Sequence, residues 1–333
     1  MILTNCAACA APLGLALGKK RGRCSTRYCG AACQAQHWKE GGHDKLCKKI
    51  KKAGGAEQYY ANKKHAEAVK VAVERCAEDT KGQKCYICLE AVHSRTGEGL
   101  VRGCACGDRD GVSSPELGVA HVSCLARQAK ISVEEAEENH LDMDPRWARW
   151  YSCSLCKRDY HGVVQHALGW ACWKTYSGRP EGDHTRTNTM RQLGNGLGAA
   201  ERHKDRLGVH EAELAIYKRS GASEKIMLQT KDNIALCYSR LGRIQESLAL
   251  RREIYANAVA LDSPSILFHA ANLCCSLRDM NCYTEAKPFL REHLLAARRT
   301  LGADDEDYIR ICWSYASCLM KPMAPPATTC AKP

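Results

Sequence analysis

Residues 84–90 read KCYICLE, residues 121–129 read HVSCLARQA and residues 150–160 read WYSCSLCKRDY. With a C-x-C pair between the first two, these segments contribute cysteine and histidine side chains in four close pairs. Zn²⁺ takes four nitrogen or sulfur ligands in a tetrahedron, and close pairs separated by long spacers let one chain hold two ions. The pattern therefore predicts two structural zinc sites, with candidate ligands Cys85, Cys88, Cys104, Cys106, His121, Cys124, Cys153 and Cys156.

The composition favours metal ligands over disulfide bonds for these cysteines. The chain has 333 residues, which suggests two or three domains, and 22 of them are cysteine. Its start, MILTNCAACA, lacks the pattern of a secretion signal, and no run approaches the roughly 18 apolar residues of a membrane span. We therefore expect a soluble intracellular protein, cytoplasmic or nuclear, with no membrane partner. In that compartment clustered cysteines favour metal; a disulfide-rich secreted protein is the alternative.

Positive charge is concentrated near the N-terminus. The formal net charge is +12, and residues 1–75 hold 15 Lys and Arg against 5 Asp and Glu. Zinc-bound cysteines are thiolates, so the true surplus is smaller. The lysine run from Lys45 to Lys52 could meet nucleic acid or an acidic peptide, or it could be the solvated face of a linker helix. No aromatic residues interleave with these lysines, which favours the linker helix over nucleic acid.

A second group of cysteines and histidines stands at the N-terminus. Cys6 and Cys9 form a C-x2-C pair, and residues 27–47 read RYCGAACQAQHWKEGGHDKLC. This stretch resembles the second half of a MYND zinc finger, a family that binds short, often proline-containing peptides. The resemblance implies a first zinc held by Cys6, Cys9, Cys29 and Cys33. It implies a second, interleaved zinc with the ligands Cys24, His43 and Cys47.

The second N-terminal site departs from the family's pattern. The family's middle pair has two cysteines, whereas this chain has Cys24 with Arg21 where the partner should stand. His37 or water could complete the site, or the site could hold no metal; His37 could instead pack beside Trp38 on a short helix.

Because a domain with so few large apolar residues cannot bury enough surface to fold alone, we expect zinc to supply folding free energy.

The central ligand order, with its histidine in sixth place, resembles that of the RING-CH (RING-variant) finger. A PHD finger has a similar ligand list, but with the histidine fifth. The RING-CH resemblance implies a cross-brace in which one zinc is held by Cys85, Cys88, His121 and Cys124. The other zinc would be held by Cys104, Cys106, Cys153 and Cys156. Fingers of this type commonly act as ubiquitin ligases. They bind an E2 enzyme that carries ubiquitin and form no covalent intermediate with ubiquitin themselves.

The same resemblance implies contacts for an E2 enzyme and for ubiquitin. The candidates are Ile87, Trp150, Leu155 and Lys157. The apolar members could instead cover the zinc core. Two departures weaken the ligase interpretation, because the spacer before the last cysteine pair is long and no membrane helix follows the finger. The acidic part of that spacer, residues 131–142, is predicted to be an exposed helical insertion capped by Ser132.

Self-similar segments follow residue 189. Residues 233–255 read NIALCYSRLGRIQESLALRREIY and residues 272–294 read NLCCSLRDMNCYTEAKPFLREHL, at an offset of 39 residues. Small residues at matching places, with Leu and Ile at helical spacing, predict antiparallel helix pairs that stack through close contacts. The period resembles the long tetratricopeptide repeats of the kinesin-light-chain type, whose arrays present a peptide-binding groove. An ordinary helical bundle is the alternative.

Together these segments predict a multi-domain chain with two small zinc-stabilised fingers followed by an α-helical, tetratricopeptide-like solenoid. The predicted parts are a MYND-like finger at 1–50, a basic helical linker at 51–83, a RING-CH-like finger at 84–176, a linker at 177–188, repeats at 189–320 and a disordered tail at 321–333. We expect Zn²⁺ as the cofactor, with three complete sites and a fourth that lacks a ligand. No hydrolase or transferase motif is visible, so no catalytic residue is predicted.

The function that this organisation predicts is a soluble, zinc-binding adapter that docks protein partners. Peptides would bind the MYND-like finger and the groove of the repeats. The chief alternative is a RING-type E3 ubiquitin ligase, with the E2 on the central finger and the substrate on the repeats. Nucleic-acid binding through the basic N-terminal segment is the third candidate.

Overall fold

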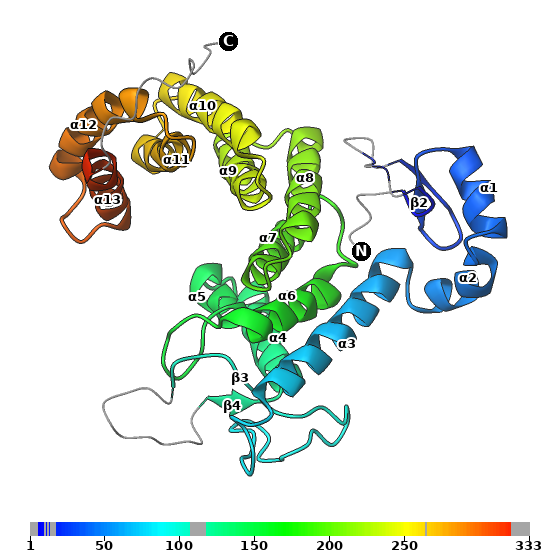
Figure 1. Ribbon diagram of the computed structural model, residues 1–333. Coiled ribbons are helices and arrows are strands. Elements are labelled where there is room, and N and C mark those ends of the chain that lie inside the picture. Colours follow the sequence, from blue (N-terminus) through cyan, green and yellow to red (C-terminus); the bar gives the residue numbers. More distant parts are fainter. Residues whose placement is uncertain are drawn as a thin grey trace. The chain divides into compact units, whose positions relative to one another are not determined.

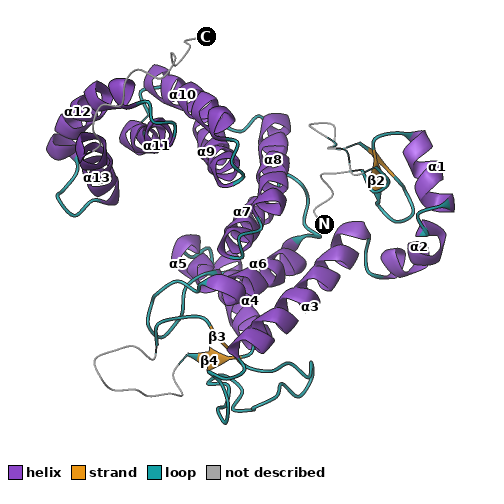
Figure 2. Ribbon diagram, in the orientation of Figure 1, coloured by secondary structure: helices purple, strands orange, loops and turns teal. Residues whose placement is uncertain are grey.

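The computed structural model describes residues 6–9, 11, 13, 18–106, 118–263 and 265–320. Within these ranges the chain is mostly helical, with thirteen α-helices, one short 3-10 helix and two small antiparallel sheets (Figures 1 and 2). It divides into two compact units, Met1–Ser220 and Gly221–Pro333. None of the described helices combines the length and apolarity needed to cross a membrane. The predicted tail at 321–333 lies outside the described residues.

Small elements with little apolar core form the N-terminal part of the first unit. They are β1 (Lys19–Lys20), β2 (Arg27–Tyr28), α1 (Ala31–Lys39) and α2 (His43–Lys52). The two strands pair as an antiparallel hairpin. Gly42, with a φ of +66°, stands between α1 and α2, a left-handed conformation that glycine adopts without strain. Helix α2 buries only His43, Cys47 and Ile50, so its lysines lie on the solvent side.

Helix α3 (Ala56–Cys76) packs along α6 (Gly162–Tyr176) through small side chains. Ala61, Ala68 and Ala72 lie on one face of α3 and are at most 3 % exposed. Such small side chains let two helices approach closely. Helix α6 is buried along most of its length, which makes it the central helix of this unit.

The central finger packs against α6 through its helices. Its elements are β3 (Val101–Arg102), β4 (Val119–Ala120), α4 (Val122–Glu138), α5 (Met143–Trp147) and the 3-10 helix η1 (Ala148–Trp150). Strands β3 and β4 form a second antiparallel hairpin. Helices α4 and η1 both contact α6, so the apolar run after the last cysteine pair completes the core of the finger.

The acidic segment of the spacer is not an insertion capped by Ser132, so that prediction is wrong. Helix α4 runs without a break from Val122 to Glu138, and Ser132 is a buried residue in its interior. Glu137 pairs with Arg179 through two hydrogen bonds of 2.7 Å, so this face is also not simply solvated.

Two further helices, α7 (His184–Ala199) and α8 (His203–Ser220), complete the first unit. Helix α7 packs on α6 almost backbone to backbone at Gly169 and Gly196. A Cβ atom added at Gly196 would lie only 2.8 Å from the carbonyl oxygen of Gln165. Glycine is therefore required at this crossing, and the first predicted repeat helix belongs to the same compact unit as the fingers.

The second unit is a stack of antiparallel helices, and the predicted fold class of fingers followed by a helical solenoid is confirmed. Its elements are α9 (Glu224–Arg240), α10 (Ile244–Ala260), α11 (Ile266–Asp279), α12 (Tyr283–Thr300) and α13 (Glu306–Met320). Each helix contacts the next, and α11 also contacts α9 and α13. Ser247 and Ala286, which match at the 39-residue offset, are both fully buried. Small residues at these places let neighbouring helices pack closely.

Candidate metal centres

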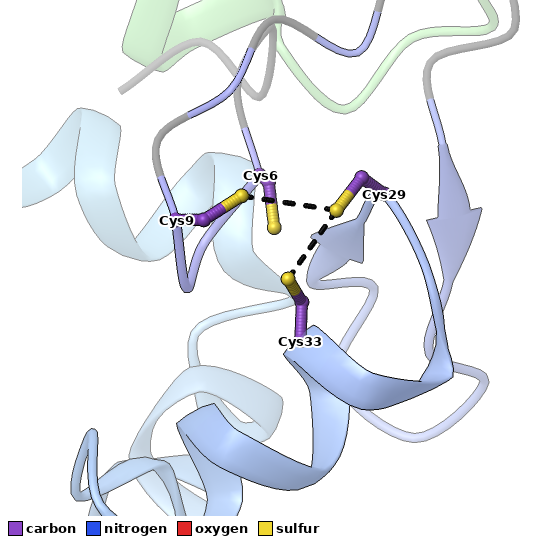
Figure 3. Close-up of side chains that lie close together, drawn as sticks. All are labelled: Cys6, Cys9, Cys29 and Cys33. Carbon is purple, nitrogen blue, oxygen red and sulfur yellow. Dashed lines mark hydrogen bonds between the residues drawn. The ribbon is translucent and has the colours of Figure 1, made fainter.

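The first candidate centre gathers four cysteine sulfurs from three separate segments. Cys6 and Cys9 lie in the N-terminal turn, Cys29 follows β2, and Cys33 lies in the first turn of α1 (Figure 3). The backbone N–H of Ala7 donates to the carbonyl of Arg27 at 3.1 Å, which ties the N-terminal turn to the hairpin. All four sulfurs lie within 4.8 Å of one another.

The sulfur–sulfur distances in this cluster fit zinc and exclude disulfides. The Sγ atoms of Cys9 and Cys29 are 3.7 Å apart, and those of Cys29 and Cys33 are 3.3 Å apart. Two sulfurs bound tetrahedrally to zinc at about 2.3 Å would lie about 3.8 Å apart, whereas a disulfide requires about 2.05 Å. Four cysteines in this arrangement therefore fit a structural Zn²⁺ ion without large movement.

The second candidate centre brings together three donors. Cys24, His43 and Cys47 are buried, and the Sγ atom of Cys24 lies 3.3 Å from the Nε2 atom of His43. His37 is not part of this group, because its Nδ1 atom pairs with the Tyr28 hydroxyl at 3.0 Å. Arg21 stacks on Trp38, with 4.1 Å between its guanidinium carbon and the ring centroid. Arg21 is a cation and cannot supply the missing fourth ligand, so the described donors of this centre number three.

The third candidate centre joins the first cysteine pair of the central finger to the start of α4. Its donors are Cys85, Cys88, His121 and Cys124. The Nδ1 atom of His121 lies 3.4 Å from the sulfur of Cys88 and 3.7 Å from that of Cys124. Because His121 is the N-cap residue of α4, the helix fixes its spacing to Cys124.

The fourth candidate centre lies at the second hairpin and the last cysteine pair. Its donors are Cys104, Cys106, Cys153 and Cys156, and the sulfurs of Cys106 and Cys153 are 3.5 Å apart. Along the chain, the ligand pairs of the third centre alternate with those of the fourth. Each centre therefore joins two segments that lie on either side of a pair belonging to the other centre. With metal bound at both centres, this interleaving would hold a finger with very short strands in one shape.

Buried thiols in these clusters cannot all lose their protons without a counter-charge. A hydrogen bond from Cys104 lowers the pKa of Cys153 to about 4, while burial raises the pKa of Cys106 to about 11. The hydrogen bond with Cys153 also raises the pKa of Cys104, so the Cys153 thiolate holds that neighbour in the protonated form. A bound Zn²⁺ would supply the missing positive charge and let every cysteine bind as thiolate. Burial also lowers the pKa of His43 and of His121, which favours the neutral imidazole that binds metal.

The four candidate contacts for an E2 enzyme differ in their exposure. Ile87 is 36 % exposed and Leu155 is 42 % exposed, so both offer apolar surface beside the third and fourth centres. Lys157 adopts a φ of +59°, and its Nζ atom donates to the carbonyl of Ser154 at 2.8 Å. Trp150 is fully buried and packs edge-on against a neighbouring tyrosine, so its assignment as a surface contact is wrong.

Two exposed apolar residues of the central finger were not singled out from the sequence. Leu89 is 72 % exposed and Val92 is 59 % exposed. Leu89 directly follows Cys88, so its position next to a candidate metal ligand could have identified it from the sequence.

The second unit contains a cavity of about 730 Å³ with polar walls. Its lining includes Asn233 and Asn272, which match at the 39-residue offset, and four arginines: Arg240, Arg251, Arg278 and Arg310. Asn272 donates to the carboxylate of Asp232 at 3.2 Å, and that carboxylate also pairs with His269. The asparagine recurs at this offset in the sequence, but it was not predicted from the sequence to be a binding residue.

Comparisons with known proteins give little further guidance. No family model and no curated protein matches the chain. Among solved structures, it is similar to a Podospora anserina protein named for nearly identical kinesin light chain TPR-like repeats, and to a variant of that protein. Each is 17 % identical with a TM-score of 0.38, and the match covers 60 % of this chain and 86 % of the other. A similarity this low supports no conclusion about function.

Proposed function

We propose that this chain is a zinc-binding adapter that docks protein partners on its fingers and on its helical repeats. The observation that carries the proposal is the gathering of cysteine and histidine donors into four groups, three of them with four ligands. Zinc in the three groups of four would be structural, because a set of four protein ligands leaves no open coordination position for a substrate. The metal would stabilise small surfaces that present side chains to partners.

The N-terminal finger is proposed to be of the MYND type and the central finger of the RING-CH type. Support comes from the ligand groups, since each set implied by these resemblances lies together in space. Bound zinc would hold the hairpin β1–β2 against α1 in the first finger. In the second, it would hold β3–β4 against the start of α4.

The repeat cavity is the proposed docking site of the second unit. Asn233 lines it, and its side chain makes no hydrogen bond within the described residues, so the side-chain amide is free to bind the backbone of an extended peptide. Peptide-library selection on the zinc-loaded full chain tests this proposal. We expect a consensus sequence that is lost on Asn233→Ala and kept on Ile226→Ala, an exposed residue of the same helix. Failure to enrich any sequence, or a consensus sequence that stays the same with Asn233→Ala, would contradict docking at this cavity.

A ubiquitin ligase is the second candidate, and the exposed apolar residues of the central finger favour it. Ile87, Leu89, Val92 and Leu155 are all at least 36 % exposed in a finger whose other large side chains are mostly buried. If these residues bind an E2 enzyme, Ile87→Ala should abolish autoubiquitination in a panel of E2 enzymes. Ile226→Ala, which removes a similarly exposed side chain from the second unit, should leave it unchanged. No activity with any E2 would leave only the adapter role.

A further inference from the structure

The first unit has a cavity whose lining includes none of the candidate metal ligands. It measures about 560 Å³, and its lining residues belong to α5, α6, α7 and the segment that follows η1. Its lining residues are Asp144, Trp147, Tyr151, Asp159, Gln165, His184, Asn188, Arg191, Gln192 and Asn195. The walls therefore combine two carboxylates, two large aromatic rings and four side-chain amides.

The two carboxylates of this cavity have no cationic partner. Neither Asp144 nor Asp159 forms an ion pair within the described ranges. Arg191 is the one arginine or lysine in the described lining, and it is engaged elsewhere. Its Nε atom lies 3.8 Å from a carboxylate oxygen of Glu213, and its Nη2 atom donates to the Tyr217 hydroxyl at 3.4 Å. The cavity thus keeps an unbalanced negative charge.

Aromatic and amide groups complete the walls. Trp147 and Tyr151 are half-buried. Gln192 is only 2 % exposed and donates its Nε2 atom to the carbonyl of Trp150 at 3.1 Å. Its Oε1 atom accepts no hydrogen bond in the part of the chain that the structure describes. Gln192 lines the cavity, so this oxygen can accept a hydrogen bond from a ligand with N–H groups.

We propose that this cavity binds an arginine or lysine side chain from a basic segment of a partner protein. The carboxylates of Asp144 and Asp159 would accept charge-assisted hydrogen bonds, which are roughly twice as strong as neutral ones. The rings of Trp147 and Tyr151 attract a cation to their faces. The many acceptors match N–H donors, whereas a quaternary ammonium has no N–H and prefers a closed aromatic cage. This site goes beyond the proposed function, since it stands whether or not the fingers and the repeats bind partners.

Calorimetric titration of the zinc-loaded full chain tests the proposal at low salt. The probes are three capped glycine-flanked peptides that differ only in carrying arginine, lysine or neutral citrulline. We expect the arginine or the lysine peptide, or both, to bind, with citrulline at least about tenfold weaker, because only the cations gain charge-assisted bonds. Binding should weaken as salt rises. Equal affinity for citrulline and the cationic peptides, or no binding of either cation, would overturn the proposal.

Two variants locate the binding at this cavity. Asp144→Asn with Asp159→Asn should weaken the cationic peptide at least about tenfold. Glu78→Gln with Asp79→Asn makes the same charge change at exposed positions beyond α3, and should leave the affinity unchanged.

If the variant with Asp144→Asn and Asp159→Asn loses its zinc or its fold, Asn195→Lys provides a second test of the same cavity. Asn195 is an exposed residue of α7 that lines the cavity, so a lysine there can be accommodated and should compete with the peptide. Undiminished binding to a folded Asn195→Lys chain would place the peptide elsewhere and overturn the assignment.

Discussion

Gly118 offers a sharp test of the fourth metal centre. Its φ is +83°, and a Cβ atom added there would lie 2.7 Å from the Cβ of Cys106 and 2.8 Å from the sulfur of Cys104. Real Cβ atoms do not approach other atoms so closely. Gly118→Ala must therefore displace either Cys104 and Cys106 or the backbone at residue 118 itself. Because the two sulfurs are candidate ligands, we expect the change to act on metal binding and not only on backbone strain.

The expected magnitude has two separable parts. An alanine forced into the left-handed region costs about 1–2 kcal/mol of folding free energy. Displaced ligands add a loss of about 10- to 100-fold in zinc affinity, the size that disturbed support of metal ligands usually produces. Gly97→Ala is the matched control, since Gly97 has a φ of +65° with no atom within 4 Å of its added Cβ. It carries the backbone strain without the collision.

Competition against a chromophoric zinc chelator measures the affinity of each variant, and thermal unfolding of the zinc-loaded chain measures its stability. Both variants should lose stability, and only Gly118→Ala should also release one zinc ion at a lower chelator concentration. Identical zinc retention by the two variants would refute the placement of Gly118 against the metal ligands.

Three other expectations follow from the structure. Burial lowers the pKa of His166 to about 4, so the stability that its neutral form contributes is complete above about pH 6.5 and is lost as the pH falls toward 4. Chemical denaturation should therefore show a loss of stability between about pH 7 and pH 5 that is about 2 kcal/mol larger in the intact chain than in His166→Gln. A strong zinc chelator should collapse the fingers while circular dichroism retains the helices of Gly221–Pro333, and simultaneous loss of all helical signal would contradict two independent units. The exposed lysines of α2 should bind nucleic acid only weakly, so a complex that stays tight at physiological salt and is lost when Lys48 and Lys49 become Ala would contradict this ranking.

The candidate ligands could be read from the sequence because their information is local. Two donors separated by two residues, such as Cys85 and Cys88, can reach one ion in almost any turn, and the spacing alone identifies them. Which pairs then share an ion depended on a family resemblance. The structure places those same sets of side chains together, including the set of three around His43. Local spacing also indicated the helical repeats, since small residues recur at one offset.

Features that depend on which side of an element faces the core were less predictable. Trp150 was a candidate surface contact, with a place in the core of the finger as the alternative, and the turn of η1 directs it against Tyr176. The error at Ser132 was avoidable, because Val122, Leu125, Ala129, Val133 and Ala136 follow a continuous helical spacing that the acidic run obscured. The acidic cavity was not predictable, since it joins side chains of α5, α6 and α7 that no local pattern relates.

The zinc content of the purified chain tests the central claim most directly. Elemental analysis should find at least three zinc ions per chain, one for each group with four ligands, and a fourth if Cys24, His43 and Cys47 hold metal with a non-protein ligand. Cys29→Ser and Cys153→Ser, which each remove a ligand from a different group, should each lower the count by one. A count of two or fewer in the intact chain, or a count unchanged by both substitutions, would contradict the account.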